Sequence, residues 1–198
     1  MAIHSVAVYC SASSAIEEHY GRAASTIGRA LAQTGLTMVF GGGRVGLMGE
    51  AARSCKAAGG RVVGVTTGKL EALEGGSPHC DELEIADSMP QRRSRMMELA
   101  DAYVILPGGL GTYEEFFEVL VGRQLGDHAK PIVIVNHDGF YDPMVAMIEH
   151  GIEHRFIAPA IRDALLVVDE AADAVPALLV YRPRRHDVTE FLYLPKAS

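Results

Sequence analysis

The chain has few cysteines, and they are not arranged in pairs. Cys10, Cys55 and Cys80 are odd in number and far apart, and no Cys-x-x-Cys pair occurs among the 198 residues. A disulfide framework needs an even set of cysteines, and a zinc knuckle needs closely paired ones. The sequence therefore argues against both, and it favours the reducing environment of the cytoplasm.

Positive charge and long apolar runs are also scarce. The chain carries 25 acidic and 18 basic residues, a formal net charge of -7, which argues against a nucleic-acid surface over most of the molecule. No apolar run reaches the roughly 20 residues of a transmembrane helix, and the N-terminus lacks the basic and apolar regions of a signal peptide. We therefore expect a small anionic ligand, no nucleic-acid partner and no membrane association.

Internal repeats, low-complexity tracts and an interdomain linker are absent as well. A chain of 198 residues that is 48% hydrophobic can bury a substantial core as one unit. We expect one domain over 1–181, followed by a basic, proline-marked tail over 182–198. The stretch 182–186 is typical of a charged surface, with a nucleic-acid or partner contact as the alternative.

Short apolar, β-branched segments alternate with helical patterns along the chain. Strands are covered by helices on both faces in a parallel sheet, so they are apolar along their whole length. The fold class predicted is α/β, a doubly wound, Rossmann-like parallel sheet with helices on both faces. The predicted strands are 5–10, 37–40, 61–65, 82–85, a run that begins at 102, 131–135 and 165–168. The predicted helices include 16–33, 50–58, 70–74, 142–152 and a last one that Asp169 caps and that ends near 181.

Two glycine-rich turns follow predicted strands, at Gly41-Gly-Gly-Arg-Val-Gly-Leu-Met-Gly49 and at Pro107-Gly-Gly-Leu-Gly-Thr112. Glycine permits positive φ and close approach of a ligand, and the helix after the second turn adds the positive end of its dipole. Neither turn ends in the Gly-Lys-Ser/Thr of a Walker sequence, and the first strand is not followed by Gly-x-Gly-x-x-Gly. Each turn predicts either a phosphate cradle or tight packing of a strand against a helix.

Glu115 follows the second turn, where a carboxylate repels a bound phosphate. It acts either one step away from the phosphate, where the chemistry takes place, or locally, because Thr112-x-x-Glu115 matches a capping box. Arg92, Arg93 and Arg95 precede the strand that feeds this turn, so they predict either a guanidinium beside the phosphate or a solvated helix face.

Two further candidates have weaker patterns. Glu74 ends the short predicted helix, either over a ligand cleft or in solvent. His150 and His154 have an i, i+4 spacing compatible with zinc, but no glutamate follows the first histidine and no third ligand is evident.

Several of these segments converge in the predicted fold. Ligands of doubly wound proteins bind at the carboxyl ends of the strands. Ser11, the turn 41–43, Arg92 and the segment 108–115 all follow or flank strand ends. One cleft therefore gathers them in the predicted fold.

The segment from Pro107 to Glu115 fits the Pro-Gly-Gly-x-Gly-Thr-x-x-Glu signature of the LONELY GUY family, and the turn 41–49 resembles the family's other glycine turn. Met89-Pro-Gln-Arg-Arg93 is similar to the family's Met-x-x-Arg-Lys, with arginine at the last position. The resemblance runs over nearly the whole chain. Many members carry an older label of lysine decarboxylase, but the sequence has no recognisable pyridoxal phosphate site.

The resemblance implies a phosphoribohydrolase that cleaves the N-glycosidic bond of cytokinin or other adenine-type nucleoside 5'-monophosphates, releasing the base and ribose 5-phosphate. It implies a homodimer and no metal or other cofactor. It places Arg92 and Glu115 at the catalytic positions. The substrate-binding residues that it and the glycine turns imply are Glu74, Arg93, Gly108, Gly109, Leu110, Gly111, Thr112, Tyr113, Glu114, Ser11, Gly42 and Gly43.

Two other functions fit the same fold class. The first is a non-catalytic carrier of a nucleotide or phosphorylated cofactor, similar to molybdenum cofactor carrier proteins. The second is a DNA-binding Rossmann-like protein, which the negative charge disfavours.

Overall fold

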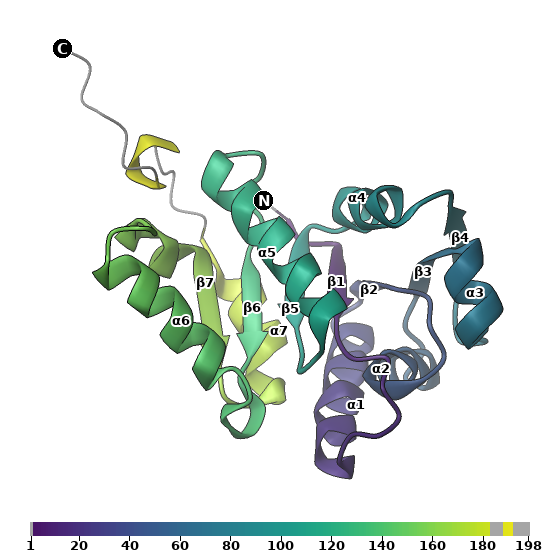
Figure 1. Cartoon of the computed structure of the whole chain (residues 1–198). Helices are drawn as coiled ribbons and strands as arrows, with labels where there is room; N and C mark the ends of the chain where they lie inside the picture. The colour runs from purple at the N-terminus through teal and green to yellow at the C-terminus, as the bar shows by residue number, and fades with distance from the viewer. Residues whose placement is uncertain (1, 183–187, 192–198) are drawn as a thin grey trace.

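The computed structural model describes residues 2–182 and 188–191, and it contains one parallel sheet (Figure 1). The sheet has seven strands in the order β4-β3-β2-β1-β5-β6-β7, as the doubly wound prediction requires. All seven predicted strands are present. Their bounds are β1 (Ser5–Tyr9), β2 (Thr37–Phe40), β3 (Val62–Thr67), β4 (Glu82–Ala86), β5 (Ala102–Ile105), β6 (Ile132–Val135) and β7 (Leu165–Val168).

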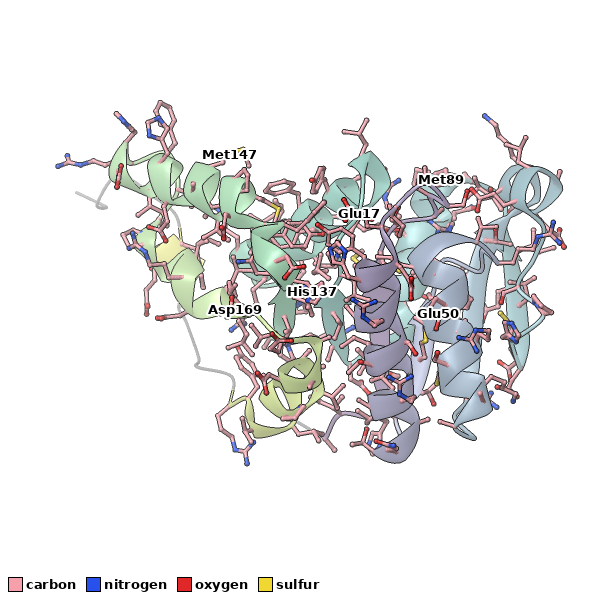
Figure 2. The ribbon with its side chains drawn as sticks, turned by 90° about the horizontal axis from the view of Figure 1, so that it is seen from below. Glu17, Glu50, Met89, His137, Met147 and Asp169 are labelled. Atoms are coloured by element: carbon pink, nitrogen blue, oxygen red, sulfur yellow. The ribbon has the colours of Figure 1, made fainter. Side chains whose placement is uncertain are left out.

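Helices cover both faces of this sheet (Figures 1 and 2). One face packs against α1 (Glu18–Gln33), α2 (Gly46–Ala57) and α7 (Ala171–Val180). The other face packs against α4 (Met89–Leu99), α5 (Leu110–Leu125) and α6 (Asp142–Glu153). The short helix α3 (Gly68–Glu74) follows β3, and three 3-10 turns complete the described chain: η1 (His137–Gly139), η2 (Pro159–Ala164) and η3 (Val188–Phe191).

The central strand β1 shows why these sequences form a buried sheet. Val6 and Val8 lie in the core beneath α1, α2 and α7, whereas Ala7 and Tyr9 lie in the core beneath α4, α5 and α6. Side chains alternate between the two faces of a strand, and both faces are covered, so every position needs an apolar residue.

Several predicted helix starts differ from the structure, since α1 begins at Glu18 and α3 at Gly68 where the sequence predicted 16 and 70. Helix α2 begins at Gly46, inside the glycine turn, and not at Glu50. Asp169 does not cap α7. The N-cap residue of this helix is Glu170, and its side chain makes no capping hydrogen bond. The start of α2 was missed because the last residues of the glycine turn, from Gly46 on, already belong to the helix.

The connections from β1 and β5 position the site. β1 pairs with β2 on one side and β5 on the other, and the helices that follow β1 and β5 lie on opposite faces of the sheet. Such a divergence opens a crevice at the carboxyl ends of the two strands. The Ser11 amide donates to the Pro107 carbonyl at 3.2 Å, which holds the two connecting loops together at this edge.

The C-terminal tail is described only in part. Phe191 is buried against the face covered by α5, and the Gln124 Nε2 donates to its carbonyl at 3.2 Å. Arg182 is exposed, and residues 183–186 of the predicted basic surface lie outside the described residues. Among the described residues, no helix is both long and apolar enough to cross a membrane.

Candidate active site

A cleft of about 230 Å³ opens at the carboxyl ends of β1 and β5. It combines residues from the β1 loop with residues from the starts of four helices. The lining residues are Cys10, Ser11, Ala12, Met48, Leu70, Met89, Arg92, Gly109, Gly111, Thr112 and Glu115. The cleft therefore brings together Ser11, Arg92 and four residues of the predicted segment 108–115, whereas the turn 41–43, which was predicted to converge with them, is not part of its lining.

Arg92 and Glu115 form a buried ion pair in the floor of this cleft. The Arg92 Nη1 donates to the Glu115 Oε1 at 3.1 Å, and their side chains are 6% and 10% exposed. The Arg92 Nε donates to the carbonyl of Val65 at 2.9 Å, which ties the guanidinium to the end of β3. A guanidinium held by two such bonds presents its charge in a fixed direction.

Gly41 makes room for this guanidinium. A Cβ at position 41 would lie only 2.0 Å from the Arg92 Nη2 and 3.0 Å from the Met48 Sδ. Gly41 is buried and follows β2 directly. The first glycine of this turn therefore serves Arg92, a close-packing role that is also part of the site.

The protonation of Glu115 is set mainly by its burial. Burial raises the pKa of the Glu115 carboxyl to about 7, against the opposing effect of the Arg92 and Arg93 guanidiniums. A carboxyl with a pKa near neutrality exchanges protons readily at physiological pH, which suits a general base. The pKa of the neighbouring Cys10 thiol is raised by its burial and by Glu115, so Cys10 is not a thiolate nucleophile.

The start of α5 borders the cleft and has no side-chain cap. The first amide to bond within this helix is that of Tyr113, which donates to the Gly109 carbonyl at 3.0 Å, and no side chain caps the helix. The amides of the preceding first turn are therefore open to a ligand. A Cβ at Gly109 or Gly111 would meet nothing within 4 Å, so both positions leave open space.

The alternative capping-box reading of Thr112 and Glu115 is wrong. Helix α5 begins at Leu110, which places Thr112 inside the first turn instead of at the N-cap. A Cβ on Gly108 would lie 2.1 Å from the Thr112 Oγ1, so the buried Thr112 side chain occupies the space above Gly108. None of the three glycines of this turn has positive φ. Their role is close approach.

The glycine turn 41–49 contributes Met48 to the cleft, and its residues 42 and 43 contact the strand β3 and the helix α3. Gly42 has φ +76° and lies against Thr66. A Cβ on Gly43 would lie 3.0 Å from the Glu74 Oε2, so the half-buried Glu74 extends over this turn, at the end of α3. None of Gly42, Gly43 and Glu74 lines the cleft, although Gly43 lies against Met48, which does.

The remaining predicted residues lie outside the cleft lining. Arg93 bridges α4 to α5, with its Nη1 3.0 Å from the Glu114 Oε1 and its Nε 2.7 Å from the Glu118 Oε2. Arg95 points to Glu84 and Glu98 instead.

Tyr113 and Leu110, at the start of α5, are not part of the cleft lining either. Tyr113 packs edge-on against Tyr141, with ring centroids 6.3 Å apart. Leu110 is 86% exposed. Direct substrate contact by these residues and by Arg93 and Glu114 stays a prediction.

Sequence reasoning missed several parts of the site. Met48, Leu70 and Met89 line the cleft as apolar residues that were not predicted for the site, although Met48 lies in the turn 41–49 and Met89 opens the Met-x-x-Arg segment. The carbonyl of Val65 holds Arg92, and a backbone acceptor leaves no signal in the sequence. Cys10 had a usable signal as well, since it ends the first predicted strand.

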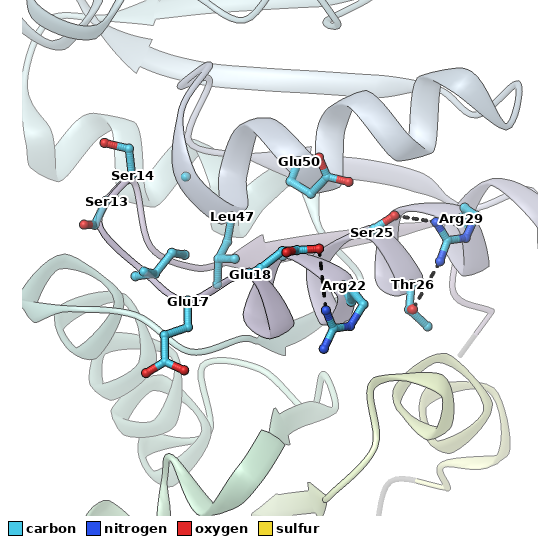
Figure 3. Close-up of a pocket in the computed structure, with 13 residues that line it drawn as sticks. Ser13, Ser14, Glu17, Glu18, Arg22, Ser25, Thr26, Arg29, Leu47 and Glu50 are labelled. Atoms are coloured by element: carbon cyan, nitrogen blue, oxygen red, sulfur yellow. Dashed lines mark hydrogen bonds and ion pairs between the residues drawn. The ribbon is translucent and has the colours of Figure 1, made fainter.

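A second, larger hollow of about 570 Å³ lies between α1 and α2 (Figure 3). Its walls are mixed polar and apolar, and both of its arginines are already paired, Arg22 with Glu18 and Arg29 with Ser25 and Thr26. It shares no lining residue with the cleft, and it contains none of the predicted site residues.

His150 lies in the last turn of α6 and His154 is its C-cap residue; both are exposed, with ring centroids 4.3 Å apart. Within residues 2–182 and 188–191, the group of side chains that could share a metal ion does not include them. The structure therefore gives the zinc interpretation of this pair no third ligand.

These features define a class of protein: a doubly wound α/β protein with an uncapped helix start and a buried arginine–glutamate pair at the point where the strand order reverses. The chain belongs to the LONELY GUY family, because residues 48–178 match the family model described as "Possible lysine decarboxylase" and the relatives below are similar over most of their length.

Two relatives carry the name cytokinin riboside 5'-monophosphate phosphoribohydrolase. The protein of Rhodococcoides fascians is 42% identical over 175 residues, which cover 88% of each chain. The protein of Mycobacterium tuberculosis is 39% identical over 172 residues, covering 87% of this chain and 91% of the relative. Among solved structures, the molybdenum cofactor binding protein from Rippkaea orientalis matches with a TM-score of 0.69 at 18% identity, covering 89% of this chain and 95% of that one. This last similarity shows the fold alone.

Proposed function

We propose that this protein is a phosphoribohydrolase that hydrolyses the N-glycosidic bond of cytokinin riboside 5'-monophosphates and related adenine nucleotides such as AMP. The products are the free base and ribose 5-phosphate. The observation that carries the proposal is the buried Arg92–Glu115 pair beside the open start of α5. The names of relatives at 42% and 39% identity support the same activity.

The substrate phosphate binds at the start of α5 in this proposal. The amides of the first turn and the positive end of the helix dipole favour an anion there, and Gly109 and Gly111 leave space for its oxygens. Binding of the phosphate holds the ribose over Arg92 and Glu115. The binding energy of the phosphate group, which does not itself react, thus helps to position the glycosidic bond for cleavage.

Glu115 carries the chemistry. Cleavage of an N-glycosidic bond develops positive charge on the ribose, which a nearby carboxylate stabilises. The same carboxylate takes a proton from water as the water oxygen bonds to C1' and the bond to the base nitrogen breaks; the departing base then takes up a proton. A pKa near 7 for Glu115 suits a group that accepts a proton in this step.

Arg92 positions Glu115 and substrate oxygens. A guanidinium stays protonated in proteins, so it is not the acid of the reaction. Its bonds to Glu115 and to the Val65 carbonyl hold both charges in place. The proposal uses no metal ion or other cofactor.

The test compares the wild type with Glu115→Gln on AMP and on isopentenyladenosine 5'-monophosphate, with chromatography of free base and ribose 5-phosphate. We expect both products from the wild type and none from Glu115→Gln, with AMP binding retained in calorimetry. Glu118→Gln is the matched control, because Glu118 lies one turn further along α5, pairs with Arg93 and does not line the cleft. Binding without turnover by the wild type would favour the carrier function.

We also propose a homodimer, one domain over 1–181 with the tail 182–198 attached, and a cytoplasmic location. The exposure of Leu110, at 86%, and of Met89, at 37%, supports the dimer, because both residues lie at the helix starts that frame the cleft. Sedimentation equilibrium tests the dimer, and a monomer at micromolar concentration would contradict it.

A further inference from the structure

Two histidines and an aspartate meet at the carboxyl edge of the sheet, away from the Arg92–Glu115 cleft. His19 lies in the first turn of α1, whereas His137 and Asp138 follow β6 in η1. The His19 Nε2 is 3.2 Å from the Asp138 Oδ2, and the His137 Nε2 is 3.9 Å from the same oxygen. One donor atom from each residue lies within 4.8 Å of the others.

These distances match the edges of a metal coordination shell. Zinc bonds of about 2.0–2.2 Å to nitrogen and oxygen place tetrahedral ligands about 3.3 Å apart. The His19–Asp138 distance has this length already, the His137–Asp138 distance of 3.9 Å is about 0.6 Å longer, and no pair of the three donor atoms is more than 4.8 Å apart. Two imidazoles and a carboxylate are a ligand set that zinc prefers.

The surroundings of His19 provide an independent argument for a metal. Its other ring nitrogen, Nδ1, is 3.4 Å from the Glu17 Oε2. A histidine that binds a metal through one nitrogen commonly donates from the other to a carboxylate, and this bond fixes the tautomer. His19 thus has Asp138 at one nitrogen and Glu17 at the other. Figure 2 labels Glu17 and His137 beside the start of α1.

Aromatic packing fixes the two imidazoles in this arrangement. The His19 ring lies 4.0 Å from the Tyr20 ring, and the Tyr20 ring contacts those of His137 and Phe140 at 5.9 Å and 5.8 Å. Ligands whose rotamers are already restricted lose little entropy when they bind an ion.

In η1, the backbone conformation of Asp138 and the ring of His137 place a carboxylate oxygen and an imidazole nitrogen near each other. Asp138 is a non-glycine residue with φ +53°, a conformation that costs energy and that directs its carboxylate between the two imidazoles. The His137 Nδ1 is buried and has no hydrogen-bond partner among the described residues, and the other ring nitrogen, Nε2, lies near the Asp138 carboxylate.

We propose that His19, His137 and Asp138 bind a divalent transition metal ion, zinc in the first instance, with Glu17 as the hydrogen-bond partner of His19. Three protein ligands leave a fourth position for water, and the 65% exposure of the Asp138 side chain gives solvent access to it. The ion would join the start of α1 to the loop after β6, segments that lie more than 100 residues apart in sequence.

The test is calorimetric titration of untagged, chelator-treated full-length protein with Zn²⁺ at pH 7.5. We expect one equivalent to bind per chain. His19→Gln, His137→Gln and Asp138→Asn should each weaken binding by at least about 10–100-fold, and Glu17→Gln by about 10-fold. Asparagine is the replacement at 138 because it tolerates positive φ. His150→Gln is the matched control, since it removes one histidine from an exposed pair that lacks a third ligand.

Two further measurements separate the site from weak surface binding. Co²⁺ in place of zinc should give visible absorption bands of a low-coordinate site in the wild type and in His150→Gln, and not in His19→Gln. Zinc at about 100 times its Kd should raise the Tm of the wild type by about 5–10 °C and leave that of His137→Gln unchanged. No binding, binding that survives His19→Gln, or binding that is lost in His150→Gln would each overturn the proposal. The His19–Asp138 contact would then be a simple ion pair.

Discussion

Replacing Gly41 with alanine tests whether the position of the Arg92 guanidinium controls the rate. The new Cβ would lie 2.0 Å from the Arg92 Nη2, whereas ordinary contact begins near 3.4 Å. The guanidinium must therefore move by about 1.4 Å, which is enough to break its 3.1 Å bond to Glu115. A displacement of this size at a catalytic group costs about 100-fold in rate. We expect kcat/KM for a nucleoside monophosphate to fall by about that factor.

The variant should remain folded, because overpacking a core by one methyl group costs about 1–3 kcal/mol. Gly60→Ala is the matched control. Its Cβ would lie 2.5 Å from the Cys55 Sγ and 2.8 Å from the Ala32 Cβ, a comparable overlap with no contact to the site. Urea unfolding should show similar losses of stability for both variants, and only Gly41→Ala should lose activity. Wild-type kcat/KM in Gly41→Ala, or an equal loss in Gly60→Ala, would refute the reasoning.

Three other outcomes follow from the same site. Because burial raises the pKa of Glu115 to about 7, the carboxyl should titrate near pH 7 by ¹³C NMR, with Glu115→Gln used for assignment; a midpoint near 4.5 would contradict its burial. The pKa of Glu115 is higher in the folded than in the unfolded protein, so its contribution to stability is complete below about pH 4.5 and is lost as the pH rises through 7. The urea midpoint of the wild type should therefore fall over that pH range relative to the midpoint of Glu115→Gln. Arg92→Ala leaves Glu115 buried without its cation and should lower the free energy of unfolding at pH 8 by about 3–5 kcal/mol. The loss caused by Arg92→Ala should be much smaller in a protein that already carries Glu115→Gln. Equal losses in the two backgrounds would show that the pair is not coupled. Gly111→Ala meets no atom within 4 Å and should stabilise α5 by up to about 1 kcal/mol while weakening AMP binding in calorimetry; unchanged binding would remove the α5 start from the phosphate site.

The strands and the place of the cleft could be predicted because their causes are local. Strands such as Ile132–Val135 are continuous apolar runs, which a sheet buried on both faces requires. The crossovers of a parallel sheet then place the glycine turns and Arg92 at one edge. The sequence was sufficient for this much, since each step uses a pattern within a few residues.

The roles of individual residues could not be predicted in the same way. Thr112 and Glu115 have the spacing of a capping box, and their actual partners are Gly108 and Arg92. The contact between Arg92 and Glu115 joins two helices across 23 residues, and no local spacing encodes it. Gly41 and Gly109 look alike in the sequence, yet one makes room for a side chain and the other leaves open space.

The position of β1 in the sheet has a consequence for synthesis of the chain. β1 lies between β2 and β5, and its partner β5 begins only at Ala102. At about 5–20 residues per second, the ribosome needs about 5–20 s to extend the chain from β1 to the end of β5. During that time the apolar edge of β1 has no neighbour on one side, and an unpaired strand edge promotes aggregation. Expression at low temperature or with holdase chaperones should therefore improve the yield of variants that destabilise β5 more than that of variants that destabilise β4.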